Sequence, residues 1–125
     1  TPLTILPDQP FTYKYEGQAW SPQNYSKTYH GDIPMYYALK NSINVATAKL
    51  GLNVGLQTII DVARRLNIKS DLEPVPSLTL GAFELYPFEV AQSYLTLARM
   101  GEQIKLHPIK TANQSSKPAN EEANR

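Results

Sequence analysis

The middle of the chain carries the clearest hydrophobic periodicity. Apolar residues recur there at helical spacing, at Leu56, Ile59, Ile60, Ala63 and Leu66. Such a repeat places its members on one face of an α-helix. Asp61, Arg64 and Arg65 fall between them and should face water. The pattern predicts an amphipathic helix over residues 56–66.

A short helix is predicted to begin at Pro34. Proline suits the first position of a helix, and it disfavours helical backbone in the residue before it. Tyr36, Leu39 and Ile43 follow at intervals of three and four residues. This spacing predicts an inward-facing stripe.

A second helix should follow a break at Asn41 and Ser42, because both residue types prefer helix caps to helix interiors. We expect it to start near residues 42–44 and to end at Gly51, since glycine commonly terminates helices.

A last helix is predicted between Pro87 and Gly101, with Glu89 in its first turn. Its apolar residues form two rows, Phe88/Ala91/Leu95/Ala98 and Val90/Tyr94/Leu97. Two rows imply burial on more than one side. Pro34 and Tyr86 occupy positions where Ser or Thr would be expected to cap a helix. Each replacement should cost about 1 kcal/mol of stability.

The segment before these helices is rich in turn formers and tyrosine. Residues 11–15 alternate in polarity and predict a short strand, with a turn at residues 16–18. Residues 20–25 predict an ordered loop, because their proline and large aromatic side chains need a surface to pack on.

Composition narrows the possible functions. The 125 residues allow one domain, placed at residues 1–112, with a flexible polar tail at 113–125. A net charge of +1 gives no electrostatic basis for binding nucleic acid. Cysteine is absent, and His30 and His107 have no partner at metal-ligand spacing, so neither a metal site nor a cofactor is predicted. No apolar stretch approaches the roughly 20 residues that span a membrane.

The only candidate for chemistry is Ser42-Ile43-Asn44, at the break between two predicted helices. Side chains at positions 42 and 44 can leave the helical ladder and point together, while Ile43 anchors the turn in the core. A serine hydroxyl can relay a proton, and an asparagine amide can both donate and accept hydrogen bonds. Helix capping explains the tripeptide equally well.

Four segments around this tripeptide occur in the order found in one known family. They are residues 20–24 (WSPQN), 37–47 (YALKNSINVAT), 76–82 (PSLTLGA) and 87–94 (PFEVAQSY). Together with the His-Gly pair at residues 30–31, they resemble the transpeptidase domain of class A penicillin-binding proteins. The resemblance runs from about residue 18 to about residue 109 and is strongest to the bifunctional proteobacterial enzymes.

The resemblance implies the mainly α, helical part of the α/β (α+β) penicillin-recognising serine transpeptidase fold, with most of the central sheet missing. It implies a D-Ala-D-Ala transpeptidase that cross-links peptidoglycan stem peptides through an acyl-enzyme and is inhibited by β-lactams. Ser42 would be the proton-relay serine of the S-x-N motif, and Asn44 would contact the substrate amide. The parent would act on the periplasmic side of the inner membrane and carry a glycosyltransferase domain.

The sequence departs from the family pattern at the two other catalytic motifs. No serine is followed by lysine three positions later, as the nucleophile motif S-x-x-K requires, so that motif is expected before residue 1. Lys110-Thr111-Ala112 resembles K-T-G but comes too early. We therefore expect this chain alone to be inactive and to need the rest of the transpeptidase domain as its partner. The alternatives are a non-catalytic helical binding module derived from the fold and, less favoured, a serine β-lactamase.

Overall fold

The computed structural model describes residues 1–103 of the chain. His107, the Lys110–Thr111–Ala112 segment and the expected tail at 113–125 lie outside the described residues. The elements in order are β1 (Ile5–Asp8), β2 (Tyr13–Tyr15), β3 (Gln18–Trp20), β4 (Gly31–Pro34), α1 (Met35–Lys40), α2 (Asn44–Val54), α3 (Leu56–Arg65), the 3₁₀ helix η1 (Pro76–Leu80) and α4 (Pro87–Ala98).

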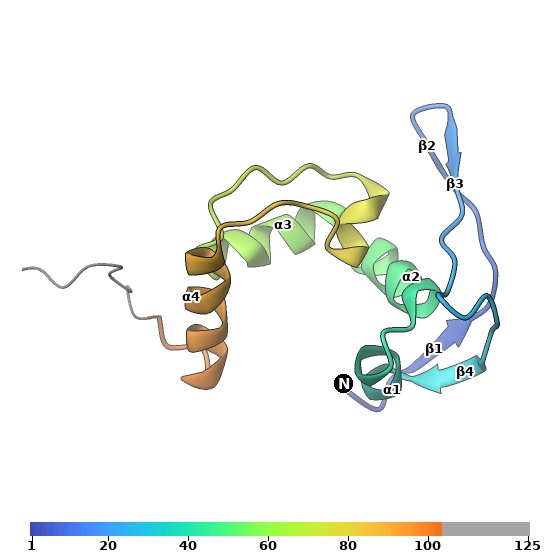
Figure 1. The fold of residues 1–125 in the computed structure, drawn as a ribbon, viewed down its shortest axis with the longest axis horizontal. Coiled ribbons are helices and arrows are strands. Elements are labelled where there is room, and N and C mark those ends of the chain that lie inside the picture. The colour runs from blue at the N-terminus through green and yellow to red at the C-terminus, as the bar shows by residue number, and fades with distance from the viewer. Residues whose placement is uncertain (104–125) are drawn as a thin grey trace, which may run out of the picture.

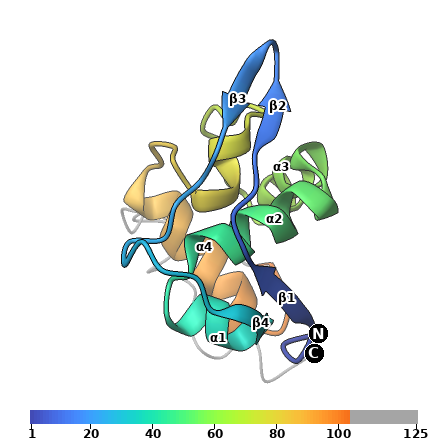
Figure 2. The ribbon, with the colours of Figure 1, turned by 90° about the vertical axis from the view of Figure 1, so that its right-hand side faces the viewer.

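These elements form an elongated arch. β1 pairs antiparallel with β4, and this two-stranded sheet lies beside α1 and α2 at one end. α2 and α3 lead towards α4 at the other end (Figure 1). β2 and β3 form a separate antiparallel hairpin that projects from the body of the arch (Figure 2). Among the described residues, no helix combines the length and apolarity needed to cross a membrane.

The predicted strand at residues 11–15 is confirmed as β2, shortened to Tyr13–Tyr15. Its turn is also where the sequence placed it. Glu16 and Gly17 both have positive φ, 46° and 77°, which is the geometry of a two-residue hairpin turn. Trp20, at the end of β3, meets Phe11 edge to face with ring centroids 6.5 Å apart.

The core lies where the β1–β4 sheet meets α1 and α2. Its buried members are Leu6, Ile33, Ala38, Ile43 and Ala46, and Val45 and Ala48 of α2 are also fully buried. The expected anchor at Ile43 is confirmed, with 7% of its surface exposed. Most of this core comes from two strands and one helix that are separated in sequence.

The prediction for α1 is wrong in two respects. Pro34 is the last residue of β4, paired with Ile5, so the helix begins one residue later at Met35. Tyr36 and Leu39 are not buried, with 51% and 81% of their surfaces exposed. α1 has only six residues, and the sheet meets the side that carries Ala38 rather than the side that carries the two larger residues.

α2 does not end at Gly51, as predicted, but continues to Val54. Gly51 is required by packing instead of by a turn. A Cβ atom there would lie 2.5 Å from Cγ2 of Thr79, so only glycine allows η1 to approach α2 this closely. Gly55, whose φ is 105°, separates α2 from α3.

The amphipathic helix predicted over residues 56–66 is confirmed as α3. Ile60 is buried, Leu56, Ile59, Ala63 and Leu66 are half-buried, and the three charged residues between them are exposed.

α4 starts at Pro87 as predicted, but the burial expected for its two apolar rows is wrong. Phe88, Tyr94 and Leu97 are exposed, whereas Gln92, Ser93 and Thr96 are buried. The hydroxyl groups of Ser93 and Thr96 donate to carbonyls of their own helix, which satisfies them without an external partner. Within the described residues, no element covers the exposed apolar side chains.

Candidate functional site

The site begins with the way α1 ends. The N–H of Ser42 donates to the carbonyl of Leu39 at 3.3 Å, and that of Ile43 donates to the carbonyl of Ala38 at 2.9 Å. This pair of bonds closes a helix around one residue in the left-handed conformation, usually glycine. Here that residue is Ser42, with φ of 52°. The turn lifts the serine out of the helix and returns Ile43 to the core.

Ser42 and Asn44 line the same shallow cavity, of about 190 Å³. Its wall also includes Leu39 from α1, Thr47 from α2 and Thr79 from η1. The two side chains that the sequence singled out are thus brought together. The lining residues carry hydroxyl, amide and apolar groups but no ionisable side chain. The cavity can therefore orient a polar ligand and relay a proton, but by itself it cannot activate a nucleophile.

The loop at residues 21–30 holds the start of α2. Ile43, at the N-cap position, has no side chain that could cap the helix. Asn24 supplies that function from another part of the chain, because its Oδ1 accepts a hydrogen bond from the N–H of Val45 at 3.0 Å. The carbonyl of Gln23 accepts a second bond, 3.1 Å long, from Nδ2 of Asn44. The WSPQN segment thus contacts the S-x-N segment directly.

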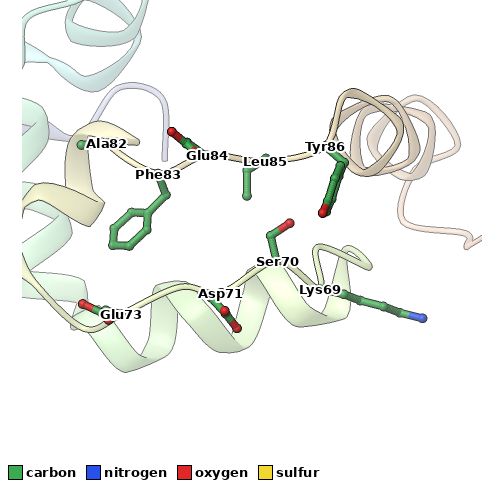
Figure 3. Close-up of a pocket in the computed structure, with 9 residues that line it drawn as sticks. All are labelled: Lys69, Ser70, Asp71, Glu73, Ala82, Phe83, Glu84, Leu85 and Tyr86. Atoms are coloured by element: carbon green, nitrogen blue, oxygen red, sulfur yellow. The ribbon is translucent and has the colours of Figure 1, made fainter.

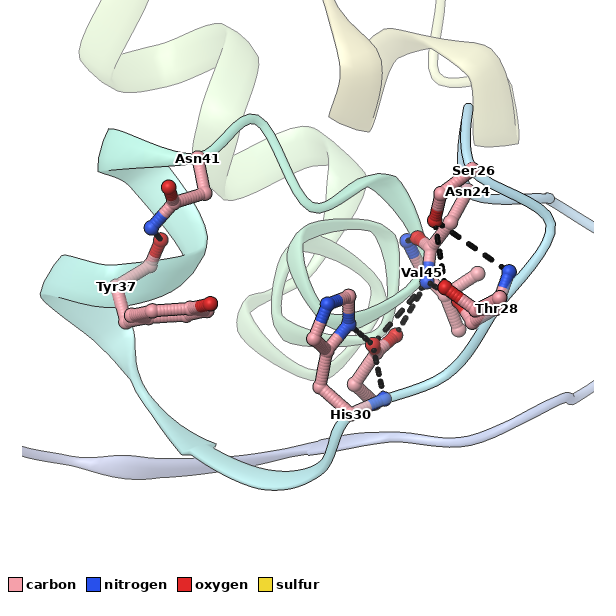
Figure 4. Close-up of polar contacts among 8 residues, drawn as sticks. Asn24, Ser26, Thr28, His30, Tyr37, Asn41 and Val45 are labelled. Carbon is pink, nitrogen blue, oxygen red and sulfur yellow. Dashed lines mark hydrogen bonds and ion pairs between the residues drawn. The ribbon is translucent and has the colours of Figure 1, made fainter.

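Asn24 is itself held by a buried carboxylate (Figure 4). Asp8, with 0% of its surface exposed, accepts from Nδ2 of Asn24 at 2.9 and 3.1 Å through its two oxygens. Its Oδ2 also accepts from the N–H of His30 at 2.8 Å and lies 2.7 Å from His30 Nδ1. Nδ2 of Asn24 further contacts the carbonyl of Thr28 at 2.8 Å.

Sequence reasoning missed Asp8 and the partner of His30. Asp8 stands in a proline-rich opening segment, and neither its spacing from His30 nor its flanking residues mark it as buried. The two meet because Asp8 pairs with Gly31 in the β1–β4 register. The pairing of β1 with β4 is what places these two residues, which are far apart in sequence, side by side.

A larger hollow of about 770 Å³ lies between the connector after α3 and the segment before α4. Ser70 points into it from one side, and Phe83 and Leu85 point into it from the other (Figure 3). Nearby, Glu89 accepts backbone N–H bonds from Lys69 and Ser70 at 2.8 and 2.9 Å. The Ser70 hydroxyl bond, supported by backbone N–H bonds, holds the pKa of Glu89 below its usual value despite the opposing desolvation. These contacts join α4 to the connector and indicate structure rather than catalysis.

Comparison with known proteins identifies the class to which this fold and site belong. No family model matches the chain. Penicillin-binding protein 1B of Vibrio cholerae is 41% identical over 110 residues, which are 86% of this chain and 14% of that protein. Penicillin-binding protein 1B of Escherichia coli is 37% identical over 112 residues, 86% of this chain and 13% of that protein.

A solved structure agrees. The crystal structure of penicillin-binding protein 1A from Haemophilus influenzae matches with a TM-score of 0.72 and 26% identity, covering 77% of this chain and 15% of that one. The chain therefore belongs to the class A penicillin-binding proteins, has their fold over the matched part, and spans about 14% of the length of the relatives it matches. The family predicted from the sequence is thus confirmed.

Proposed function

We propose that this chain supplies the S-x-N segment of a serine-type D-Ala-D-Ala transpeptidase. The observation that carries the proposal is the cavity shared by Ser42 and Asn44, in a chain that belongs to the penicillin-binding proteins. Left-handed backbone at Ser42 supports it further, because strain at a non-glycine residue concentrates at functional sites.

In this proposal each residue has one role. The Ser42 hydroxyl passes a proton between the general base beside the nucleophile and the departing D-alanine amine. The Asn44 amide holds the substrate amide. The nucleophilic serine, its lysine and the carboxylate-binding K-T-G strand come from other parts of the domain. That serine attacks the stem peptide, releases D-alanine and forms the acyl-enzyme, which an amine of a neighbouring stem peptide then attacks. A β-lactam acylates the same serine and leaves it trapped as an acyl-enzyme.

The whole protein would accordingly be bifunctional, with a glycosyltransferase domain, and would act on the periplasmic side of the inner membrane. Its partners would be peptidoglycan stem peptides and β-lactams. The 125-residue chain alone would be inactive, because its cavity lacks a base and none of its serines is followed by lysine three positions later.

The test is covalent labelling with a fluorescent penicillin. The whole protein should be labelled, the isolated 125-residue chain should not, and Ser42→Ala in the whole protein should slow acylation by about 10²-fold, as expected for loss of a proton relay. Thr58→Ala, which removes a hydroxyl from an exposed residue of α3 outside the cavity, should leave the rate unchanged. Labelling of the isolated chain would contradict its inactivity, and normal labelling of Ser42→Ala would contradict the role of Ser42.

A second candidate is a non-catalytic helical binding module derived from this fold. The exposed apolar side chains of α4, at Phe88, Tyr94 and Leu97, favour it, because such surfaces mark contacts with a partner. A stable, monodisperse 125-residue chain, together with a whole protein that no penicillin labels, would select this alternative.

A further inference from the structure

The carboxylate of Asp8 fixes the orientation of one amide in the loop above the cavity. An ionised carboxylate only accepts hydrogen bonds, and so does the carbonyl of Thr28. Both acceptors lie within 3.1 Å of the same side-chain atom of Asn24. That atom must therefore be the amide nitrogen, Nδ2, which donates to them. The Oδ1 of Asn24 is left to face the N-terminus of α2, where it meets the N–H of Val45.

That bond cannot be replaced by solvent. Val45 is fully buried, so its N–H would lose its partner without gaining a water molecule if Asn24 turned or were truncated. Ile43 offers no side-chain cap in its place. The direction of the first turn of α2 is thus set by a loop residue 21 positions before it in the sequence.

The same turn carries Asn44. One amide hydrogen of Asn44 is taken by the carbonyl of Gln23, the neighbour of Asn24, and no other described residue bonds this amide. Its second hydrogen and its Oδ1 remain for a ligand in the cavity that Asn44 lines. Any shift of the loop at Gln23 and Asn24 would therefore turn the Asn44 amide.

We propose that Asp8, Asn24 and His30 form a positioning network for Asn44. His30 holds Oδ2 of Asp8 through its N–H and Nδ1, and the carboxylate in turn orients Asn24. Asn24 and Gln23 together orient the amide of Asn44 towards the cavity. None of the three network residues lines the cavity, so each would act through Asn44. The inference rests on the proposed function, because it explains how Asn44, which would bind the substrate amide, is held in position.

The test compares acylation rates of the whole protein by a fluorescent penicillin. Asn24→Ala should slow acylation by about 10- to 100-fold, the range typical of lost support for a residue that binds a ligand. Asp8→Asn, which keeps the shape but puts an NH₂ group where only acceptors fit, should slow it less. Asn53→Ala is the matched control, because Asn53 is an exposed asparagine on the same helix, and it should leave the rate unchanged.

A double-mutant cycle separates positioning from mere stabilisation. If Asn24 acts through Asn44, adding Asn24→Ala to Asn44→Ala should change the rate by less than about threefold. Full additivity of the two losses, or a normal rate in both Asn24→Ala and Asp8→Asn, would overturn the inference. A whole protein that is not labelled, or one that Asn44→Ala does not impair, would overturn the proposed function and this inference with it.

Discussion

Ser42 combines a polar side chain with a backbone conformation that glycine adopts more readily. The left-handed region costs a residue with a Cβ atom about 1 kcal/mol, and helices that end in this way normally place glycine there. A serine at this position, with φ of 52°, therefore makes the fold somewhat less stable than glycine would. A local loss of stability of this kind is common where a side chain is needed for function.

At this position stability and activity should therefore separate. We expect Ser42→Gly to leave the free energy of unfolding unchanged or to raise it by up to about 1 kcal/mol, because relief of strain offsets the added entropy of the unfolded chain. Acylation by penicillin should fall by about 10²-fold in the same variant. Thermal unfolding and labelling of the whole protein measure the two effects.

Asn67 provides a control for the backbone effect. Its φ of 65° lies in the same region, outside the cavity. Asn67→Gly should change stability little, since asparagine tolerates this conformation, and should not change acylation. Normal acylation in Ser42→Gly would show that the turn alone matters and the hydroxyl does not.

At the level of elements, one carboxylate joins α4 to the rest of the chain. Glu89 accepts hydrogen bonds from the backbone of Lys69 and Ser70 and, at 3.4 Å, from the N–H of Tyr86 at the start of its own helix. The last contact partly compensates for the missing Ser or Thr cap at Tyr86, because it satisfies one N–H at the start of the helix.

The lowered pKa of Glu89 predicts a pH dependence of stability. The ionised form is favoured in the folded state, so its stabilisation is complete above the ordinary glutamate pKa of 4.5 and is lost as pH falls through the lower folded pKa. Glu89→Gln should therefore lower the urea midpoint at pH 7, and the difference from the unsubstituted protein should shrink below pH 4.5.

Glu84→Gln, at an exposed glutamate of the preceding segment, is the matched control and should shift the midpoint little at any pH. A difference for Glu89→Gln that stays constant from pH 7 to acid would show that the charge of Glu89 does not matter.

Across the whole molecule, packing is uneven along the arch. α2 contacts β1, α1, α3 and η1, and several of its residues are fully buried. α4 makes few contacts with other described elements and exposes Phe88, Tyr94 and Leu97. The apolar side of α4 is therefore left uncovered by the other described elements.

This asymmetry predicts a difference in local stability. In the isolated 125-residue chain, backbone amides of α4 should exchange with deuterium faster than those of α2, because opening α4 exposes less buried surface. Hydrogen–deuterium exchange followed by mass spectrometry measures both helices in one experiment. Equal protection of α4 and α2 would contradict the uneven packing.

Features that depend on neighbouring residues could be predicted from the sequence. The periodicity of α3, the start of α4 at Pro87, the hairpin turn at Glu16 and Gly17, and the anchor at Ile43 all follow from local spacing and backbone preference. The motif order likewise led to the correct family.

The other features depend on contacts between segments that are distant in the sequence. Gly51 reads locally as a helix end but is a point of close approach to Thr79, and the rows of α4 read as buried although no described element covers them. Asp8 meets Asn24 and His30 only through strand pairing and loop closure. The local pattern shows which face of a helix or strand is apolar. Whether another element packs on that face depends on contacts between distant segments. For the same reason, the tripeptide at residues 42–44 could be recognised in the sequence, but the hydrogen bonds that hold it in place could not.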